Sequence, residues 1–290
     1  MDDWGGVAAR FSVYLTLCFA FGIPLQAAID GWRLRRRWLL AMTMAALLAS
    51  LLAFLTQIAA MTATPILPID REILWTVVDE TPLGTAFVVR FVALGVAVAG
   101  ALCGYRAVII VCGASGVALS TVAWTGHGAM QDGVAGTWHL VADVAHLLAG
   151  GAWLGAMAVL LSRLVPVRGA TNDFAIALHR FATSGSVLVA TIVMSGAINV
   201  GMILGKQGVA TLPFTLYGRL LLMKLFLFSM MLVLAARHRW WLGPRLHATL
   251  DQGDPGAAAY TLRRSLALEL GAGVAILAVV AWLGTLSPSS

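Results

Sequence analysis

Eight long apolar segments constrain the fold of this chain more than any other feature of its sequence. Each has about the 20 residues that an α-helix needs to cross the hydrocarbon core of a bilayer. A helix is also the element that satisfies its backbone hydrogen bonds within a single lipid-exposed segment. The sequence therefore predicts an all-α polytopic membrane bundle of about eight transmembrane helices. The segments are Ala9–Ala28, Leu39–Met61, Leu83–Gly104, Ala107–Thr125, Leu140–Leu161, Ile176–Leu204, Leu216–Ala236 and Leu266–Thr285.

The low content of charged residues supports the same fold class. Only 11% of the 290 residues are Asp, Glu, Lys or Arg, and 60% are hydrophobic. A soluble domain has roughly 25% charged residues. The apolar segments and their connections use nearly all of the chain, so we expect residues 1–290 to form a single transmembrane domain.

The distribution of arginine predicts which side of the membrane each connection faces. The first connection reads DGWRLRRRW, and the other odd-numbered connections also carry arginine, whereas the second, TATPILPIDREILWTVVDETPLG, is acidic. Cytoplasmic loops are enriched in Lys and Arg, so we expect the odd connections in the cytoplasm and both termini in the periplasm. The net charge of +6 reflects this bias. It does not indicate a surface for nucleic acid.

The most unusual polar residues lie in the stretch GHGAMQDGVAGTWHLVADVAHLLAGGAWLGAM. It contains Asp143 and three of the six histidines of the chain, His127, His139 and His146. Ionisable residues inside a membrane are costly, usually face the bundle interior and mark function. At about 100° per residue, His139, Asp143 and His146 fall within an arc of roughly 60° on one helix face, with His146 about 10 Å deeper. A polar stripe is therefore predicted along the fifth helix.

The same residues predict a metal site near the outer end of that helix. A glycine-rich turn, GAMQDGVAG, is expected to bring His127 to the head of the fifth helix. Imidazole is the commonest metal ligand, and nitrogen sites bind copper most strongly among the divalent ions. Asp143 would either ligate the metal or fix the tautomer of a ligating histidine. The alternative is an interhelical hydrogen-bond cluster without metal.

Three further side chains are candidates for a supporting role. Met61 and Met130 lie at outer helix ends or in outer loops, where their thioether sulfurs would suit Cu(I). Such a mixed site would hold either Cu(I) or Cu(II), and simple packing of both methionines is the alternative. Trp153 continues the histidine face toward the cytoplasm, and we expect it to pack as a plug beneath the site.

Isolated charges in other segments are candidate partners of this site. Arg90 and Lys224 lie in the outer halves of the third and seventh segments. Each would serve as a counter-ion for Asp143, gate a cation path or extend to the interface. Glu269 lies in the inner part of the last segment, where we expect it to pair near the interface, with a cation relay as the alternative. We expect His238 on the cytoplasmic side, outside the site.

The sequence resembles the bacterial inner-membrane copper-resistance family CopD over nearly its whole length. The most specific parts are WHLVADVAHLLAGGAWLGAM, with its H-x3-D-x2-H pattern and following WLG, and YGRLLLMKLFLF. The resemblance implies a multi-pass inner-membrane protein that captures periplasmic copper and passes it toward the cytoplasm. It also implies a separate CopC-like periplasmic carrier as a partner. Matched by motif, His127, His139, Asp143 and His146 are the positions implied to matter for copper.

Two other functions stay open at this point. A haem-binding membrane electron-transfer protein needs axial ligands on opposite sides of the iron. His139 and His146 share one helix face and suit that geometry poorly, whereas His127 paired with either one would suit it. A copper sensor or storage protein would bind the same ion without transport. We expect no enzymatic activity.

Overall fold

The computed structural model describes residues 4–63, 66, 70–125, 133–164, 172–252 and 256–287. Within these ranges the chain forms α-helices with short 3-10 and π segments, and it contains no β-strand. Eight of the helical segments are long and apolar enough to cross a membrane. The predicted all-α membrane bundle is therefore confirmed.

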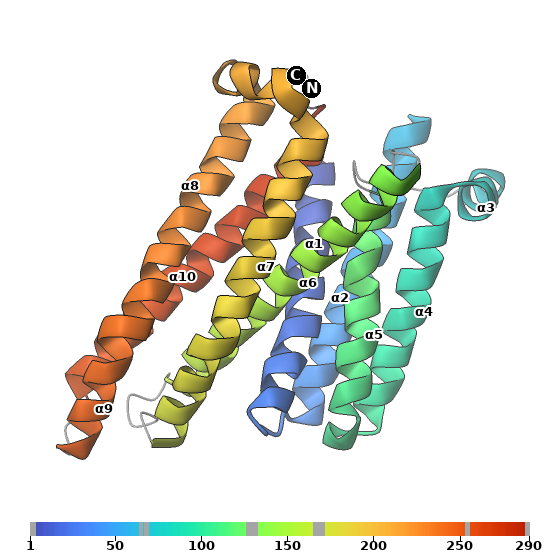
Figure 1. Cartoon of the computed structure of the whole chain (residues 1–290). Coiled ribbons are helices and arrows are strands. Elements are labelled where there is room, and N and C mark those ends of the chain that lie inside the picture. Colours follow the sequence, from blue (N-terminus) through green and yellow to red (C-terminus); the bar gives the residue numbers. More distant parts are fainter. Residues whose placement is uncertain are drawn as a thin grey trace.

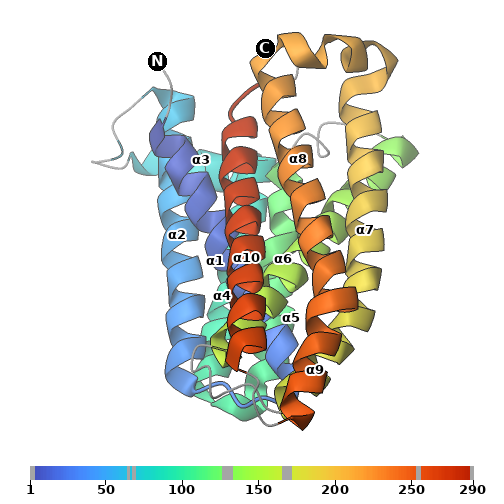
Figure 2. The ribbon, with the colours of Figure 1, turned by 90° about the vertical axis from the view of Figure 1, so that its left-hand side faces the viewer.

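The spanning helices run up and down along the bundle, and the ends of the chain lie together at the end that carries α3 (Figures 1 and 2). The short helix α9 lies at the opposite end, where the first, arginine-rich connection also lies. The helices are α1 (Trp4–Ile29), α2 (Arg36–Thr62), α3 (Arg71–Glu80), α4 (Pro82–Leu102), α5 (Val108–Ser120), α6 (Gly133–Arg163), α7 (Asn172–Thr211), α8 (Leu216–Arg237), α9 (Gly243–Asp251) and α10 (Gly256–Leu283). The shorter turns are η1 (Tyr105–Ala107), η2 (Thr121–Thr125), η5 (Leu212–Phe214) and the π-helical η6 (His238–Leu242).

Two features of the connections differ from the sequence-based expectation. α6 begins at Gly133 rather than Leu140, so the second half of the expected glycine-rich turn is helical. Gly133 has φ +77°, a value that glycine adopts without steric cost, and the chain enters the helix there. The acidic second connection contains α3, which begins where the Asp70 carboxylate accepts the backbone N–H of Glu72 at 2.9 Å.

The bundle is organised around close contact between α1 and α6. A Cβ added to Gly155 would lie closer than 3.0 Å to backbone atoms of Gly22, and one added to Gly22 would overlap the backbone at Gly151. Small residues four positions apart allow such close approach of helices in membranes. α6 has the largest buried share of the eight spanning segments. It is covered by α1 and α7 and also contacts α10.

Candidate metal centre

The histidine face of α6 packs against α7. His139 is 1% exposed, and Asp143 and His146 are half-buried. His139 Nε2 lies 3.9 Å from Asp143 Oδ2, one helical turn below. The early start of α6 places His139 well inside the helix, more deeply buried than an interfacial residue would be.

Asp143 is held by an amide from α7. Asn199 Nδ2 donates a hydrogen bond of 2.5 Å to Asp143 Oδ1. The other amide atom, Asn199 Oδ1, is buried and accepts no hydrogen bond from the part of the chain that the structure describes. Because buried polar atoms are normally satisfied, this oxygen is a free acceptor for a water molecule or a cation beside Asp143.

His146 is oriented by a hydrogen-bond chain along α7. Ser195 Oγ donates to the Thr191 carbonyl oxygen at 2.6 Å, and it lies 3.0 Å from His146 Nδ1. A serine hydroxyl carries one hydrogen. Because that hydrogen is used toward Thr191, Nδ1–H of the imidazole donates to Ser195. The lone pair of His146 is then on Nε2, where it is available to a metal ion.

Of the two expected charge partners, the structure brings Lys224 to this face. Lys224 on α8 acts electrostatically on both Asp143 and His146. Arg90 lies on another side of the bundle, where its Nε donates to Thr121 Oγ1 of η2 at 2.8 Å. Arg90 is therefore a link between α4 and η2 in this structure, whereas Lys224 lies close enough to Asp143 for their charges to interact.

Of the other predicted ligands, the structure describes Met61. His127 and Met130 lie outside the described residues. Met61 is 60% exposed near the end of α2, a helix that packs on α1 and α4. Among the residues that the structure places, no group of three or more His, Cys, Asp and Glu is spaced to hold a metal ion. The printed contacts pair His139 with Asp143, Asp143 with Asn199, and His146 with Ser195 along this face.

Trp153, which was expected to plug the face below the site, is a buried residue of α6. It is 3% exposed, and its ring meets Phe181 of α7 edge-on with 5.9 Å between centroids. Its Nε1 donates to Glu269 Oε1 of α10 at 2.8 Å. Glu269 is 0% exposed and its other oxygen, Oε2, lies 3.0 Å from His238 Nδ1.

Sequence reasoning missed the partners that α7 and η6 supply. Thr191, Ser195 and Asn199 recur at every fourth position of α7, and this spacing alone indicates a polar stripe on one helix face. His238 was expected apart from any site, yet it is 7% exposed. It begins the π-helical η6, whose wider turn changes the direction of its side chains from that of an α-helix.

Comparison with known proteins relates both halves of the chain to one family. Residues 1–137 match the family model Copper resistance protein D-like, N-terminal domain, and residues 175–283 match the model Copper resistance protein D. Copper resistance protein D of Pseudomonas syringae pv. tomato is 37% identical over 305 residues, covering 99% of this chain and 98% of that protein. Inner membrane protein YebZ of Escherichia coli (strain K12) is 28% identical over 303 residues, which cover 97% of this chain and 98% of that protein. No solved structure matches the chain.

Proposed function

The chain belongs to the copper resistance protein D family, and on this premise we propose that it transports copper across the inner membrane of a bacterium. The ion is captured on the face between α6 and α7 and passed toward the cytoplasm. The observation that carries this proposal is the chain from His146 through Ser195 to Thr191, which leaves Nε2 of His146 open. The placement in the inner membrane is supported by the E. coli relative, an inner membrane protein.

The capture step uses the donors that converge on this face. His146 Nε2 and Asp143 supply a nitrogen and a carboxylate, and Asn199 Oδ1 is an oxygen that has no other partner among the described residues. His139 lies one turn above Asp143, and we assign His127 as a further ligand from the segment that precedes α6. Imidazole with oxygen donors suits copper in the divalent state, and added thioether ligands would favour Cu(I).

Lys224 gives the empty site its charge balance. Without an ion, its ammonium group compensates the Asp143 carboxylate. When copper binds, two cations share one carboxylate and repel each other. This repulsion weakens retention of the ion, which suits a protein that must release its cargo rather than store it.

The residues at the two ends of the α6 face indicate how copper arrives at the site and where it goes next. The acidic segment that contains α3 lies at the end where the chain termini lie, and negative charge there raises the local concentration of cations. A separate periplasmic CopC-like protein is the proposed donor at that end. Below His146 the buried ring of Trp153 closes the same face, so passage of the ion requires Trp153 to move.

The test is uptake of isotopic copper into proteoliposomes that contain the purified full chain. We expect flux above that of empty liposomes, and we expect the double variant His139→Ala/His146→Ala to lose both high-affinity binding and flux while it stays folded. Binding without flux in the unmodified protein would instead support a sensor or storage protein. A Soret band in the purified protein would support the haem alternative. Copper is a cargo in this proposal, and the chain is assigned no catalysed reaction.

A further inference from the structure

A second polar cluster lies in the bundle, toward the end opposite the chain termini. It joins three elements, since Trp153 of α6 donates to Glu269 of α10, and Glu269 lies against His238 of η6. His238 Nε2 is in turn 2.7 Å from Ser265 Oγ of α10. All four residues are at most 7% exposed. A carboxylate with this degree of burial within membrane-spanning helices is costly and is a functional candidate.

The side chains of this cluster can form hydrogen bonds in two protonation states without movement of the backbone. Glu269 Oε2 makes no hydrogen bond of good geometry with the described residues, and its near neighbour is His238 Nδ1 at 3.0 Å. With one proton on the imidazole, Nδ1–H faces the carboxylate and the Ser265 hydroxyl donates to Nε2. With a second proton, Oε2–H of Glu269 donates to Nδ1 and Nε2–H donates to Ser265 Oγ, because a hydroxyl both donates and accepts. Loading one proton changes the net charge of the His238–Glu269 pair from −1 to zero.

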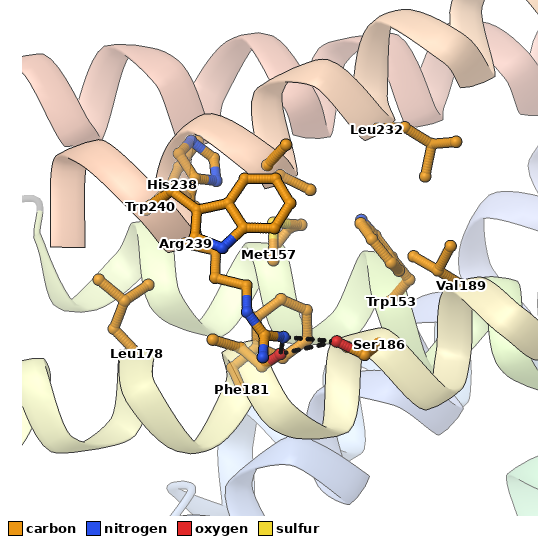
Figure 3. A pocket seen from close by; sticks show the side chains of 15 residues that line it. Trp153, Met157, Leu178, Phe181, Ser186, Val189, Leu232, His238, Arg239 and Trp240 are labelled. Carbon is orange, nitrogen blue, oxygen red and sulfur yellow. Dashed lines mark hydrogen bonds between the residues drawn. The ribbon is translucent and has the colours of Figure 1, made fainter.

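A cavity of about 420 Å³ reaches His238 of this pair and is lined by Trp153 as well. It lies between α7 and α8, which make few direct contacts, and it opens beside the exposed Arg239 and Trp240 of η6. Figure 3 shows Trp153 and His238 at its wall, with the Arg239 guanidinium reaching across to Ser186 of α7. Polar groups on the lining give water molecules the partners that they need.

The charged groups around the pair are few in the described structure. His238 and Arg239, both from η6, are the ionisable residues on the cavity lining, while α6, α7 and α8 contribute aromatic, apolar and small side chains there. On α10, Glu269 and the Ser265 hydroxyl face His238. Arg239 is tied to α7 through the Ala182 carbonyl oxygen at 2.6 Å, so it lines the entrance and is no partner of the carboxylate.

We propose that His238 and Glu269 form a proton-binding site, loaded through this cavity from the cytoplasmic end, and that its proton is coupled to copper movement. The coupling passes through Trp153. Its N–H bond to Glu269 is charge-assisted, and therefore stronger, when the carboxylate is ionised and the pair is empty. A proton that neutralises the carboxylate weakens this bond and releases Trp153 from beneath the copper-binding face. This coupling rests on the proposed transport function, whereas proton binding by the pair does not.

Proton binding is tested by infrared spectroscopy of the purified full chain across a pH series. We expect a pH-dependent carboxyl C=O band, with matching imidazole bands, that is lost in Glu269→Gln and altered in His238→Asn. Asp143→Asn, which removes the carboxylate beside the copper face, should keep this band. If Glu269→Gln fails to fold, Ser265→Ala serves instead, because removal of the hydroxyl should shift the pH at which the bands change. Identical spectra for the unmodified protein and all folded variants of the pair would overturn the proposal.

Coupling is tested in proteoliposomes that contain a pH indicator and isotopic copper. We expect copper uptake to change the internal pH, and we expect Trp153→Phe, which keeps the ring but not the N–H donor, to uncouple the two movements while the infrared titration persists. Copper flux without any pH change would overturn the coupling and leave copper transport standing. Absence of copper flux with an intact infrared titration would overturn the transport function and leave proton binding standing.

Discussion

Replacing Ser195 with alanine tests whether the hydrogen bond at His146 selects the copper-binding tautomer. Ser195 is 4% exposed and accepts from Nδ1 at 3.0 Å. The variant removes this acceptor but keeps the helix, because the Thr191 carbonyl can still accept a backbone N–H in α7. The imidazole would keep only its contact with the Ile192 backbone, so its proton can move to Nε2 more readily and the ring can rotate, and both changes remove the lone pair from the site.

The expected loss of copper affinity follows from the strength of the single hydrogen bond between Ser195 and His146. A typical intramolecular hydrogen bond contributes roughly 0.5–1.5 kcal/mol, and 1.4 kcal/mol corresponds to about a tenfold change in affinity. Loss of a partner that orients a metal-binding histidine typically costs about 10- to 100-fold in affinity. We therefore expect Ser195→Ala to weaken copper binding by about tenfold with little change in thermal stability.

The assay is competition between the purified protein and a copper chelator of known affinity, combined with ¹⁵N NMR of the histidine side chains. We expect the spectrum of His146 to change from the Nδ1–H form to a mixture of tautomers. Ser184→Ala is the matched control, since Ser184 is exposed on the same helix and also donates to a backbone carbonyl, that of Phe181. Unchanged affinity and tautomer in Ser195→Ala, or an equal loss in Ser184→Ala, would refute the reasoning.

Three further predictions address packing, charge and pH. Gly155→Ala should lower the free energy of unfolding by about 1–3 kcal/mol, because the added Cβ meets the Gly22 backbone. Gly150→Ala is the control, since a Cβ there meets no atom within 4 Å. Thermal unfolding of both variants in detergent checks this, and equal melting temperatures would argue against it. Lys224→Met should bind copper more tightly and release it more slowly, which stopped-flow release to a chelator measures; faster release would contradict the proposed repulsion. Copper affinity should fall as pH falls, because protons compete for the imidazoles; a pH-independent affinity would exclude histidine ligands.

The segments that cross the membrane were predictable because hydrophobic length is a local property of the sequence. All eight predicted spans correspond to spans in the structure, and the common face of His139, Asp143 and His146 follows from helical spacing alone. The start of α6 was less predictable, because the polar and glycine-rich residues that precede Leu140 carry little hydrophobic signal. α3 was missed for a similar reason, since its acidic composition resembles that of a loop.

The partners across helices could not be predicted from the sequence. Asn199 meets Asp143, and Glu269 meets His238, only because helices distant in the sequence pack at particular depths and rotations. Those rotations depend on contacts such as Gly22 with Gly155 and on the π-helical turn at His238. Neither these interhelical contacts nor the π-helical turn produces a periodic pattern that can be read from a single sequence.

The backbone contact between α1 and α6 limits how these two helices can move relative to each other. Where Gly22 meets Gly151 and Gly155, no side chain lies between the two backbones, so α6 cannot tilt there without carrying α1 along. α7 and α8, by contrast, have a cavity between them and few direct contacts. We therefore expect a change in access to the α6 face to involve motion of α8 relative to α7, while the proposed copper ligands of α6 stay fixed against α1.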